Sequence, residues 1–283
     1  MNKLEARGIC KAYTKGEMTI EVLRDINLTV APSEFVSIVG ASGCGKTTFL
    51  RILDGLIQPE RGQILIDDRS VTEPGHDRGF VFQADCLLPW RTVIDNVALG
   101  LELQGKDRQA ARESARPFIR LVGLQGFENS HPGELSGGMR QRANLARALV
   151  INPKVLLMDE PFAALDAQTR EIMQQELLRI WSHERKTVLF VTHQIEEAVY
   201  LSDRVIVFTA RPGRIKQIVT VQLGRPRPFE MKQGPEFNGY VRRIWKLIEE
   251  EVLASMGMQS GPALQNSPSV DIEMPGYGVK NLQ

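Results

Sequence analysis

Short apolar runs alternate along this chain with longer stretches of helical periodicity. Residues 26–30 alternate apolar and polar side chains, which predicts a strand with one buried face. Residues 35–39 are almost continuously apolar, as expected of a strand covered on both faces of a parallel sheet. Similar runs predict further buried strands over residues 79–83, 155–158 and 188–192.

Helical periodicity fills the intervals between these predicted strands. Apolar residues between positions 49 and 56 recur at helical spacing, and the same spacing predicts helices over 136–150 and 167–184. Alternating strands and helices indicate an α/β fold, with a parallel sheet covered by helices. Residues 90–150 have little strand character and predict a helical insertion, in which Pro117 should kink or break a helix.

The sequence changes character after residue 224. The run Arg-Pro-Arg-Pro at 225–228 predicts a boundary, and a C-terminal helical extension is expected over 226–256. Residues 257–283 are rich in Gly, Pro, Ser and Asn without any period, so we expect a disordered tail. The predicted apolar face of the C-terminal helix comprises Val241, Ile244, Trp245, Ile248 and Val252.

Composition limits the classes of protein that need consideration. The chain has 283 residues, 42% of them hydrophobic, and a net charge of +1, so neither nucleic acid nor an acidic surface is indicated as a partner. Its three cysteines are far apart, which argues against a disulfide framework or a zinc site. The charged N-terminal segment does not resemble a secretory signal, and no apolar run approaches the length of a membrane span.

The sequence Gly-Ala-Ser-Gly-Cys-Gly-Lys-Thr at 40–47 matches the phosphate-binding P-loop pattern between a predicted strand and a predicted helix. Glycines allow the backbone N–H groups to curl around a phosphate, and the helix start adds unpaired donors. Lys46 supplies a positive charge, and the Thr47 hydroxyl can coordinate Mg²⁺. The candidate ATP-binding residues here are Gly40, Ala41, Ser42, Gly43, Cys44, Gly45, Lys46, Thr47 and Thr48.

Two carboxylates end the predicted strand at 155–158. Ligands of open parallel sheets gather at the carboxyl ends of the strands, so Asp159 and Glu160 are expected near the P-loop. We expect Asp159 to bind Mg²⁺ through water, and Glu160 to act as a base or to orient water. The alternative is a solvated acidic turn without a catalytic role.

A second glycine-containing helix start follows at Leu-Ser-Gly-Gly-Met-Arg-Gln-Arg, residues 135–142. The Ser136 side chain can cap this helix, and its hydroxyl and the following N–H groups form another anion site. One nucleotide at one P-loop does not need two such sites, whereas two chains packed head to tail would use both. Arg140 and Arg142 are expected to be solvated or salt-bridged.

With these motifs in this order, residues 3–225 resemble the nucleotide-binding subunits of ABC transporters. The family signature is usually Leu-Ser-Gly-Gly-Gln, and Met139 is a departure from it. The resemblance implies an ABC nucleotide-binding domain over 1–225. Its fold would be a P-loop NTPase with a RecA-like parallel sheet core, an N-terminal antiparallel β subdomain and an inserted α-helical subdomain at about 90–150.

The resemblance also implies roles for single residues. Tyr13 matches the aromatic that stacks on adenine, Gln83 the glutamine that contacts Mg²⁺ and water, and His193 the switch histidine at the γ-phosphate. The implied catalytic residues are Lys46, Gln83, Glu160 and His193, and the implied Mg²⁺ ligands are Thr47, Gln83 and Asp159. ATP would lie between two copies of the chain, with the second copy contributing Ser136, Gly137, Gly138 and Asp166.

The resemblance is greatest to the nitrate, sulfonate and taurine importer branch, which implies the cytoplasmic face of a bacterial membrane. The partners would be separate integral membrane permease subunits and an extracytoplasmic solute-binding protein, with no nucleic acid. The apolar residues Leu87, Leu88 and Trp90 either contact the permease or pack inside the helical insertion. Two alternatives stay open: an exporter or lipid-handling ATPase, and a soluble ABC ATPase acting on nucleic acid or the ribosome. An accessible Cys44 thiol would make ATP binding sensitive to alkylation.

Overall fold

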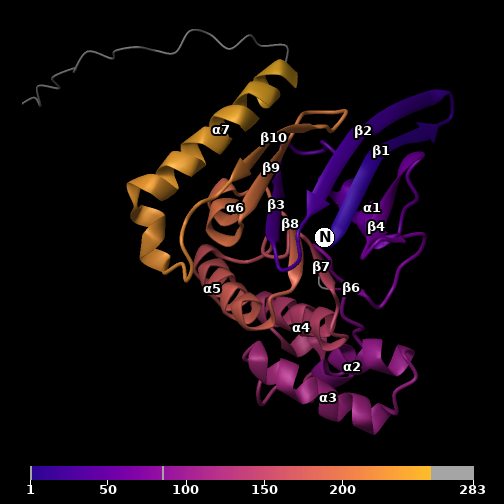
Figure 1. The fold of residues 1–283 in the computed structure, drawn as a ribbon. Helices are drawn as coiled ribbons and strands as arrows, with labels where there is room; N and C mark the ends of the chain where they lie inside the picture. The colour runs from indigo at the N-terminus through magenta and orange to yellow at the C-terminus, as the bar shows by residue number, and fades with distance from the viewer. Residues whose placement is uncertain (1, 85, 256–283) are drawn as a thin grey trace, which may run out of the picture.

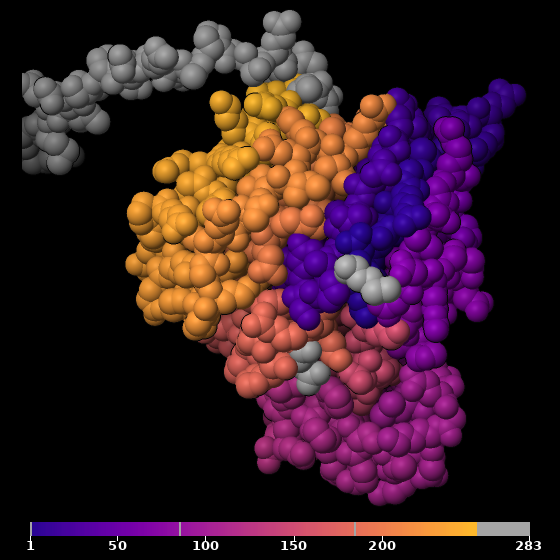
Figure 2. Space-filling model, viewed as in Figure 1, coloured from indigo at the N-terminus to yellow at the C-terminus, as the bar shows by residue number. Residues whose placement is uncertain are grey.

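A computed structural model describes residues 2–84 and 86–255, and the tail predicted at 257–283 lies outside these residues. The described chain forms two β-sheets, a group of helices below them and a long C-terminal helix along one side (Figure 1). The space-filling view shows the N-terminal strands, the helical insertion and the C-terminal segment as three regions of one surface (Figure 2).

The larger sheet carries the P-loop and the acidic motif at the ends of its strands. Its strand order is β10-β9-β3-β8-β7-β6, and all neighbouring pairs are parallel except β10 with β9. β3, β7 and β8 are buried at every residue, as their continuous apolar runs predict. The strands are β3 (Phe35–Val39), β6 (Arg78–Val81), β7 (Val155–Asp159), β8 (Thr187–Val191), β9 (Arg204–Phe208) and β10 (Ile215–Thr220).

The smaller sheet is antiparallel and has the order β2-β1-β4-β5. Its strands are β1 (Leu4–Lys15), β2 (Met18–Val30), β4 (Arg61–Ile66) and β5 (Arg69–Ser70). Residues 26–30 alternate buried and exposed positions, as their sequence predicts. Ile26, Leu28 and Val30 belong to the same apolar cluster as Val36 and Ile38, so the small sheet packs directly onto the large one.

Two sets of helices cover the large sheet. α1 (Lys46–Asp54) contacts β7 and β8, and α6 (Ile195–Leu201) contacts β3 and β9. α5 (Ala167–Glu184) contacts α6. α1 and α6 each begin within a few residues of the carboxyl end of a parallel strand, which brings their first turns to one edge of the sheet.

The helical insertion contains α2 (Val93–Leu103), α3 (Arg108–Leu121), the short 3₁₀ helix η1 (Pro132–Glu134) and α4 (Gly137–Val150). α4 also contacts β6, so it joins the insertion to the sheet. The predicted break at Pro117 is not observed, because α3 continues through it to Leu121. Pro117 is exposed, so the carbonyl that loses a backbone partner is not forced to be buried unpaired.

The chain continues beyond β10 into η2 (Phe229–Gln233) and α7 (Pro235–Ser255). α7 lies against α6 and β9, with Phe237 and Ile244 fully buried in the main apolar cluster. One part of the predicted apolar face is wrong, because Trp245 is 61% exposed. The contact surface is centred on Ile244 and includes the predicted residues Val241 and Ile248, and it extends also to Tyr240 and Leu247. No helix among the described residues is both long and apolar enough to cross a membrane.

Candidate nucleotide-binding site

The P-loop follows β3 and leads directly into α1. Gly45 is the residue before the helix, with φ of +103°, and a Cβ there would lie 2.7 Å from the Cδ2 atom of Leu23. Only glycine fits this position without displacing its neighbours. No side chain caps the start of α1, so its first backbone N–H groups are available to an anion.

Lys46 is 6% exposed, and its ammonium group lies inside the loop. It donates hydrogen bonds to the carbonyl oxygens of Gly40, at 2.9 Å, and Ala41, at 3.0 Å. The carbonyl groups that accept these bonds are neutral, so a negative charge bound nearby would stabilise the buried ammonium group. The arrangement therefore prepares a cationic site for a phosphate group.

Two oxygen ligands lie next to each other beside the P-loop. The Thr47 hydroxyl donates a 3.0 Å hydrogen bond to Asp159, the last residue of β7. Burial raises the pKa of the Asp159 carboxyl group, so a cation bound beside it would stabilise the charged form of this side chain. Mg²⁺ prefers oxygen ligands, and proteins usually offer it only one or two of them beside a phosphate group. The Thr47 hydroxyl and the Asp159 carboxylate therefore fit this ion.

Glu160 lies immediately after β7 in a left-handed backbone conformation, with φ of +45°. Its carboxylate is 3.2 Å from the Nδ1 atom of His193, which follows β8, and it accepts a 3.5 Å hydrogen bond from Gln83. Gln83 lies two residues beyond β6, which ends at Val81 rather than at residue 83 as predicted. β6, β7 and β8 are neighbours in the sheet, so their carboxyl ends bring the three side chains together.

Lys46, Thr47, Gln83 and Glu160 line one open cavity of about 510 Å³, and Asp159 and His193 contact two of these lining residues. Tyr13 contributes an aromatic ring that is 43% exposed, and Ile20 and Val22 of β2 provide an apolar wall beside it. The cavity therefore has an apolar end at the small sheet and a cationic end at the P-loop. The lining comprises Tyr13, Ile20, Val22, Ser42, Gly43, Gly45, Lys46, Thr47, Thr48, Gln83, Glu160 and Arg211.

Arg211 is a lining residue that sequence reasoning missed. It lies in the turn between β9 and β10, and its guanidinium donates hydrogen bonds of 3.1 and 3.3 Å to the carbonyl of Gly43 in the P-loop. The same turn packs closely behind the loop, since a Cβ at Gly213 would lie 2.2 Å from the carbonyl oxygen of Cys44. A single arginine before a Pro-Gly turn belongs to no recognised nucleotide-binding motif, so only its positive charge could have indicated this position.

Ser136, Gly137, Gly138 and Asp166 line a different cavity, of about 700 Å³. Ser136 caps α4, because its hydroxyl accepts a 3.3 Å hydrogen bond from the N–H of Met139. Asp166 caps α5 by accepting a 2.9 Å bond from the N–H of Thr169, which lowers the pKa of its carboxyl group. None of the four residues lines the P-loop cavity, so the structure does not bring them to Lys46 within one chain.

Arg140, Arg142 and Cys44 each contact their own chain. Arg140 donates to the backbone carbonyl of Leu135, and Arg142 to those of Val122 and Gly123. The Cys44 side chain is buried behind the P-loop, and this burial raises the pKa of its thiol. A buried thiol with a raised pKa is a poor nucleophile, so Cys44 is not an accessible target.

The apolar residues after Gln83 divide between the two alternatives left open by the sequence. Leu87 is buried in the main apolar cluster together with residues of α2 and α4. Leu88 is half-buried, and Trp90 is 72% exposed. Leu87 therefore packs inside the molecule, whereas Trp90 presents a large apolar surface to the outside.

Comparison with known proteins agrees with this geometry. The family model described as ABC transporter matches residues 23–163. An uncharacterized ABC transporter ATP-binding protein of Methanocaldococcus jannaschii is 52% identical over 254 residues, which cover 90% of this chain and 94% of that protein. This chain belongs to the ABC transporter family. It is an ABC-type ATPase.

Other relatives of this ABC ATPase have more specific names. The nitrate import ATP-binding protein of Synechocystis is 42% identical, with 89% of this chain and 99% of that protein covered. An aliphatic sulfonates import ATP-binding protein of Bacillus cereus is 44% identical, with coverage of 78% and 86%. The resemblance to the nitrate and sulfonate branch is thereby confirmed.

Among solved structures, a dimeric ATP-binding cassette in a post-hydrolysis state, bound to ADP and Pi, superimposes with a TM-score of 0.70 at 33% identity. The match covers 78% of this chain and all of that one. The predicted fold class, a P-loop NTPase with an antiparallel β subdomain and a helical insertion, is confirmed.

Proposed function

We propose that two copies of this ABC ATPase bind ATP between them and hydrolyse it to drive import of a small anion through separate membrane permease subunits. The observation that carries the dimer is the division of the site between two cavities. One holds Lys46 and Glu160, and the other holds Ser136 and Asp166. A second chain, arranged head to tail, would bring its signature residues to the first chain's P-loop.

At each site, the backbone N–H groups of the P-loop and Lys46 hold the phosphates. Glu160 accepts a hydrogen bond from a water molecule. This bond orients a lone pair of the water oxygen toward the γ-phosphorus. The water oxygen forms a bond to phosphorus as the bond to the ADP oxygen breaks, and the water passes one proton to the Glu160 carboxylate, so the products are ADP and inorganic phosphate. His193 and Gln83, which already contact the Glu160 carboxylate, position it and the γ-phosphate. Mg²⁺ held by Thr47, Gln83 and Asp159 would neutralise phosphate charge.

The base of the nucleotide is expected at the apolar end of the cavity. Tyr13 is exposed there and can stack on adenine, with Ile20 and Val22 beside it. The Lys11 ammonium lies 5.4 Å from the centroid of the Tyr13 ring. Aromatic stacking is tolerant of base identity, so specificity for adenine over guanine should be modest.

The import role is supported by relatives named for nitrate and sulfonate import and by the exposed ring of Trp90. In this proposal Trp90 docks on a permease at the cytoplasmic face of a bacterial membrane. An extracytoplasmic solute-binding protein delivers the anion to the permease from the other side. Nucleic acid has no part in the proposal.

The test is affinity purification from detergent-solubilised membranes, with identification of the chains that co-purify. A polytopic permease in the eluate supports the proposal, and the anion carried can then be identified from its binding protein. Trp90→Ala should reduce permease recovery, whereas Trp245→Ala, which removes another exposed tryptophan, should not. A soluble complex, ribosomes or nucleic acid instead of a permease would contradict the transport role, whereas equal recovery of the permease with both variants would contradict the docking role of Trp90.

A further inference from the structure

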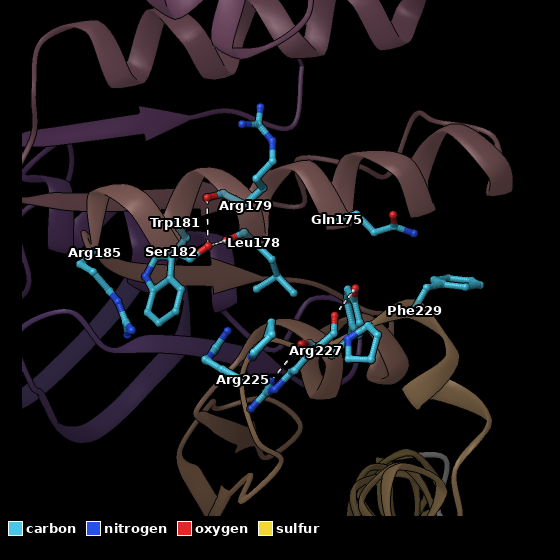
Figure 3. A pocket seen from close by; sticks show the side chains of 12 residues that line it. Gln175, Leu178, Arg179, Trp181, Ser182, Arg185, Arg225, Arg227 and Phe229 are labelled. Carbon is cyan, nitrogen blue, oxygen red and sulfur yellow. Dashed lines mark hydrogen bonds between the residues drawn. The ribbon is translucent and has the colours of Figure 1, made fainter.

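A third cavity, of about 480 Å³, shares no lining residue with the P-loop cavity and shares Arg179 with the cavity of Ser136 and Asp166. It is formed where the second half of α5 meets α6 and the segment that leads from β10 to η2 (Figure 3). Its volume falls in the range of cavities that bind small molecules. The lining comprises Gln175, Leu178, Arg179, Trp181, Ser182, Arg185, Tyr200, Arg225, Pro226, Arg227, Pro228 and Phe229.

The lining of this arginine cavity contains four arginines and, among the described residues, no acidic side chain. Arg179 is the exception in orientation: it points away from the other three and binds Glu176 and the carbonyl of Leu121 (Figure 3). Arg185, Arg225 and Arg227 remain, and they come from two separate segments of the chain. Such convergence of positive charge on a concave surface favours an anionic occupant.

Arg227 is 6% exposed and is held entirely by backbone carbonyls of the described chain. Its guanidinium donates to Val199, Tyr200 and Ser202 at the end of α6, and to Leu223. Its buried Nε atom has no hydrogen-bond partner among the described residues. Burial, followed by the charge of Arg225, lowers the pKa of Arg227 to about 10. Among the described residues, Arg227 at the base of the cavity is thus held by carbonyl oxygens and forms no ion pair with a carboxylate.

Arg225 and Arg185 both contact the ring of Trp181, with guanidinium carbons 4.2 and 4.9 Å from the ring centroid. Arg225 also binds Asp203. The exposed Arg185 side chain has no ion pair or hydrogen bond among the described residues, so its donors are free for a ligand. Trp181 itself is fixed, because its indole N–H donates to the carbonyl of Lys186.

We propose that the arginine cavity binds a small organic anion, with a carboxylate or sulfonate group at Arg185 and Arg225 and an apolar body against Leu178. Guanidinium groups recognise such planar or tetrahedral oxyanions with paired hydrogen bonds. Leu178, Pro226 and Pro228 supply the apolar wall that an inorganic anion would leave uncovered. The site is separate from the P-loop cavity, because the two cavities share no residue.

The proposal is tested by the fluorescence of Trp181 in full-length protein carrying Trp90→Phe and Trp245→Phe, without nucleotide. Benzoate is the probe, and benzamide is its neutral match. Saturable quenching by benzoate and not by benzamide is expected. Arg185→Gln should weaken benzoate binding about tenfold, because it removes a charge-assisted contact, and Arg185→Lys should weaken it less, because lysine keeps the charge but not the paired hydrogen bonds.

Arg179→Gln is the matched control, since Arg179 belongs to the same helix and the same lining but binds elsewhere. It should leave benzoate affinity unchanged. Thermal unfolding of each variant checks that the fold persists, and ATP binding checks the other site. Absence of saturable quenching, equal quenching by benzamide, or equal weakening by Arg179→Gln and Arg185→Gln would each overturn the proposal.

Discussion

Glu160 is the side chain on which turnover is expected to depend. Its carboxylate lies within 3.2 Å of His193 and 3.5 Å of Gln83, at the junction of three strand ends. Glu160→Gln keeps the shape of the side chain but removes the charge that orients water, so kcat should fall by about 10²–10⁴-fold while ATP still binds. Steady-state hydrolysis and nucleotide binding measure the two effects separately.

Glu249→Gln is the control for that substitution, because Glu249 is an exposed glutamate of α7 far along the chain from the motif residues. Its ATPase activity should match that of the unaltered protein. Normal hydrolysis by Glu160→Gln would remove Glu160 from the proposed mechanism while leaving the fold and the ATP site as they are.

Arg211 adds a positive charge to the P-loop cavity that no motif indicates. In the structure its guanidinium binds the carbonyl of Gly43, within reach of the loop that holds the phosphates. Arg211→Ala should raise the KM for ATP about three- to tenfold, the effect of one charge-assisted contact. Arg214→Ala, an exposed arginine of the same turn, should have no effect, and equal changes in both variants would show a non-specific charge effect.

The three cysteines should differ sharply in reactivity. Burial raises the pKa of the Cys44 thiol, so the thiolate fraction at neutral pH falls below that of an exposed cysteine. Iodoacetamide at neutral pH should therefore label exposed Cys86 first and leave Cys44 unmodified in the folded protein. Mass spectrometry locates the label, and an ATPase assay should show retained activity. Rapid labelling of Cys44 would contradict the buried position.

Most of the site could be predicted because its residues follow recognisable strands. Asp159, Glu160 and His193 each come directly after a buried apolar run, and parallel strands place their ends together. Arg211 could not be predicted, because its contact depends on how the β9–β10 turn folds onto the P-loop. The arginine cavity could not be predicted for the same reason. Arg185 and Arg225 are 40 positions apart in the sequence, and the fold places both of them against the ring of Trp181.

At the scale of elements, periodicity located helices better than it identified their buried faces. α5 was predicted over its observed residues, and α4 begins one residue after its capping serine. In α7, however, the neighbouring elements do not cover all five apolar residues of the predicted face. Ile244 lies at the centre of the contact, and Trp245, one residue on, is turned outward. Which edge of a broad stripe is buried depends on the neighbouring element, here α6 and β9.

This difference gives a paired stability prediction for α7. Ile244→Ala removes a side chain that is 0% exposed and should lower the free energy of unfolding by about 2–5 kcal/mol. Trp245→Ala, at 61% exposed, should change it by less than about 1 kcal/mol. Urea unfolding of the two variants measures both. Similar losses would mean that Trp245 is covered in solution, and no loss from Ile244→Ala would mean that α7 does not contribute to the folded core.

On the scale of the whole molecule, α5 connects two of the cavities. Its N-cap residue, Asp166, lines the cavity that also contains Ser136, and its C-cap residue, Arg185, lines the arginine cavity. There are 18 helical residues between these two caps. At 1.5 Å per residue, the helix is about 27 Å long. An anion bound at one end and a second chain bound at the other would thus act on the same rigid element.

The head-to-tail arrangement can be tested by mixing two inactive variants. Lys46→Ala removes the P-loop charge, and Ser136→Asp keeps a helix-capping residue while placing a negative charge where phosphate should bind. Each variant alone should form no intact site. In a mixed dimer, the P-loop of the Ser136→Asp chain meets the unaltered signature of the Lys46→Ala chain, so one complete site is restored.

ATP hydrolysis should therefore reappear when the two purified variants are combined, and it should be highest near equal amounts, where mixed dimers are most abundant. If each chain instead used its own signature residues, every site in the mixture would carry a lesion and no activity could return. Adding Glu160→Gln to the Ser136→Asp chain should abolish the recovered activity, because that chain supplies the active P-loop and its base. The same change in the Lys46→Ala chain should have no effect, which assigns Lys46 and Glu160 to one side of the ATP and Ser136 to the other.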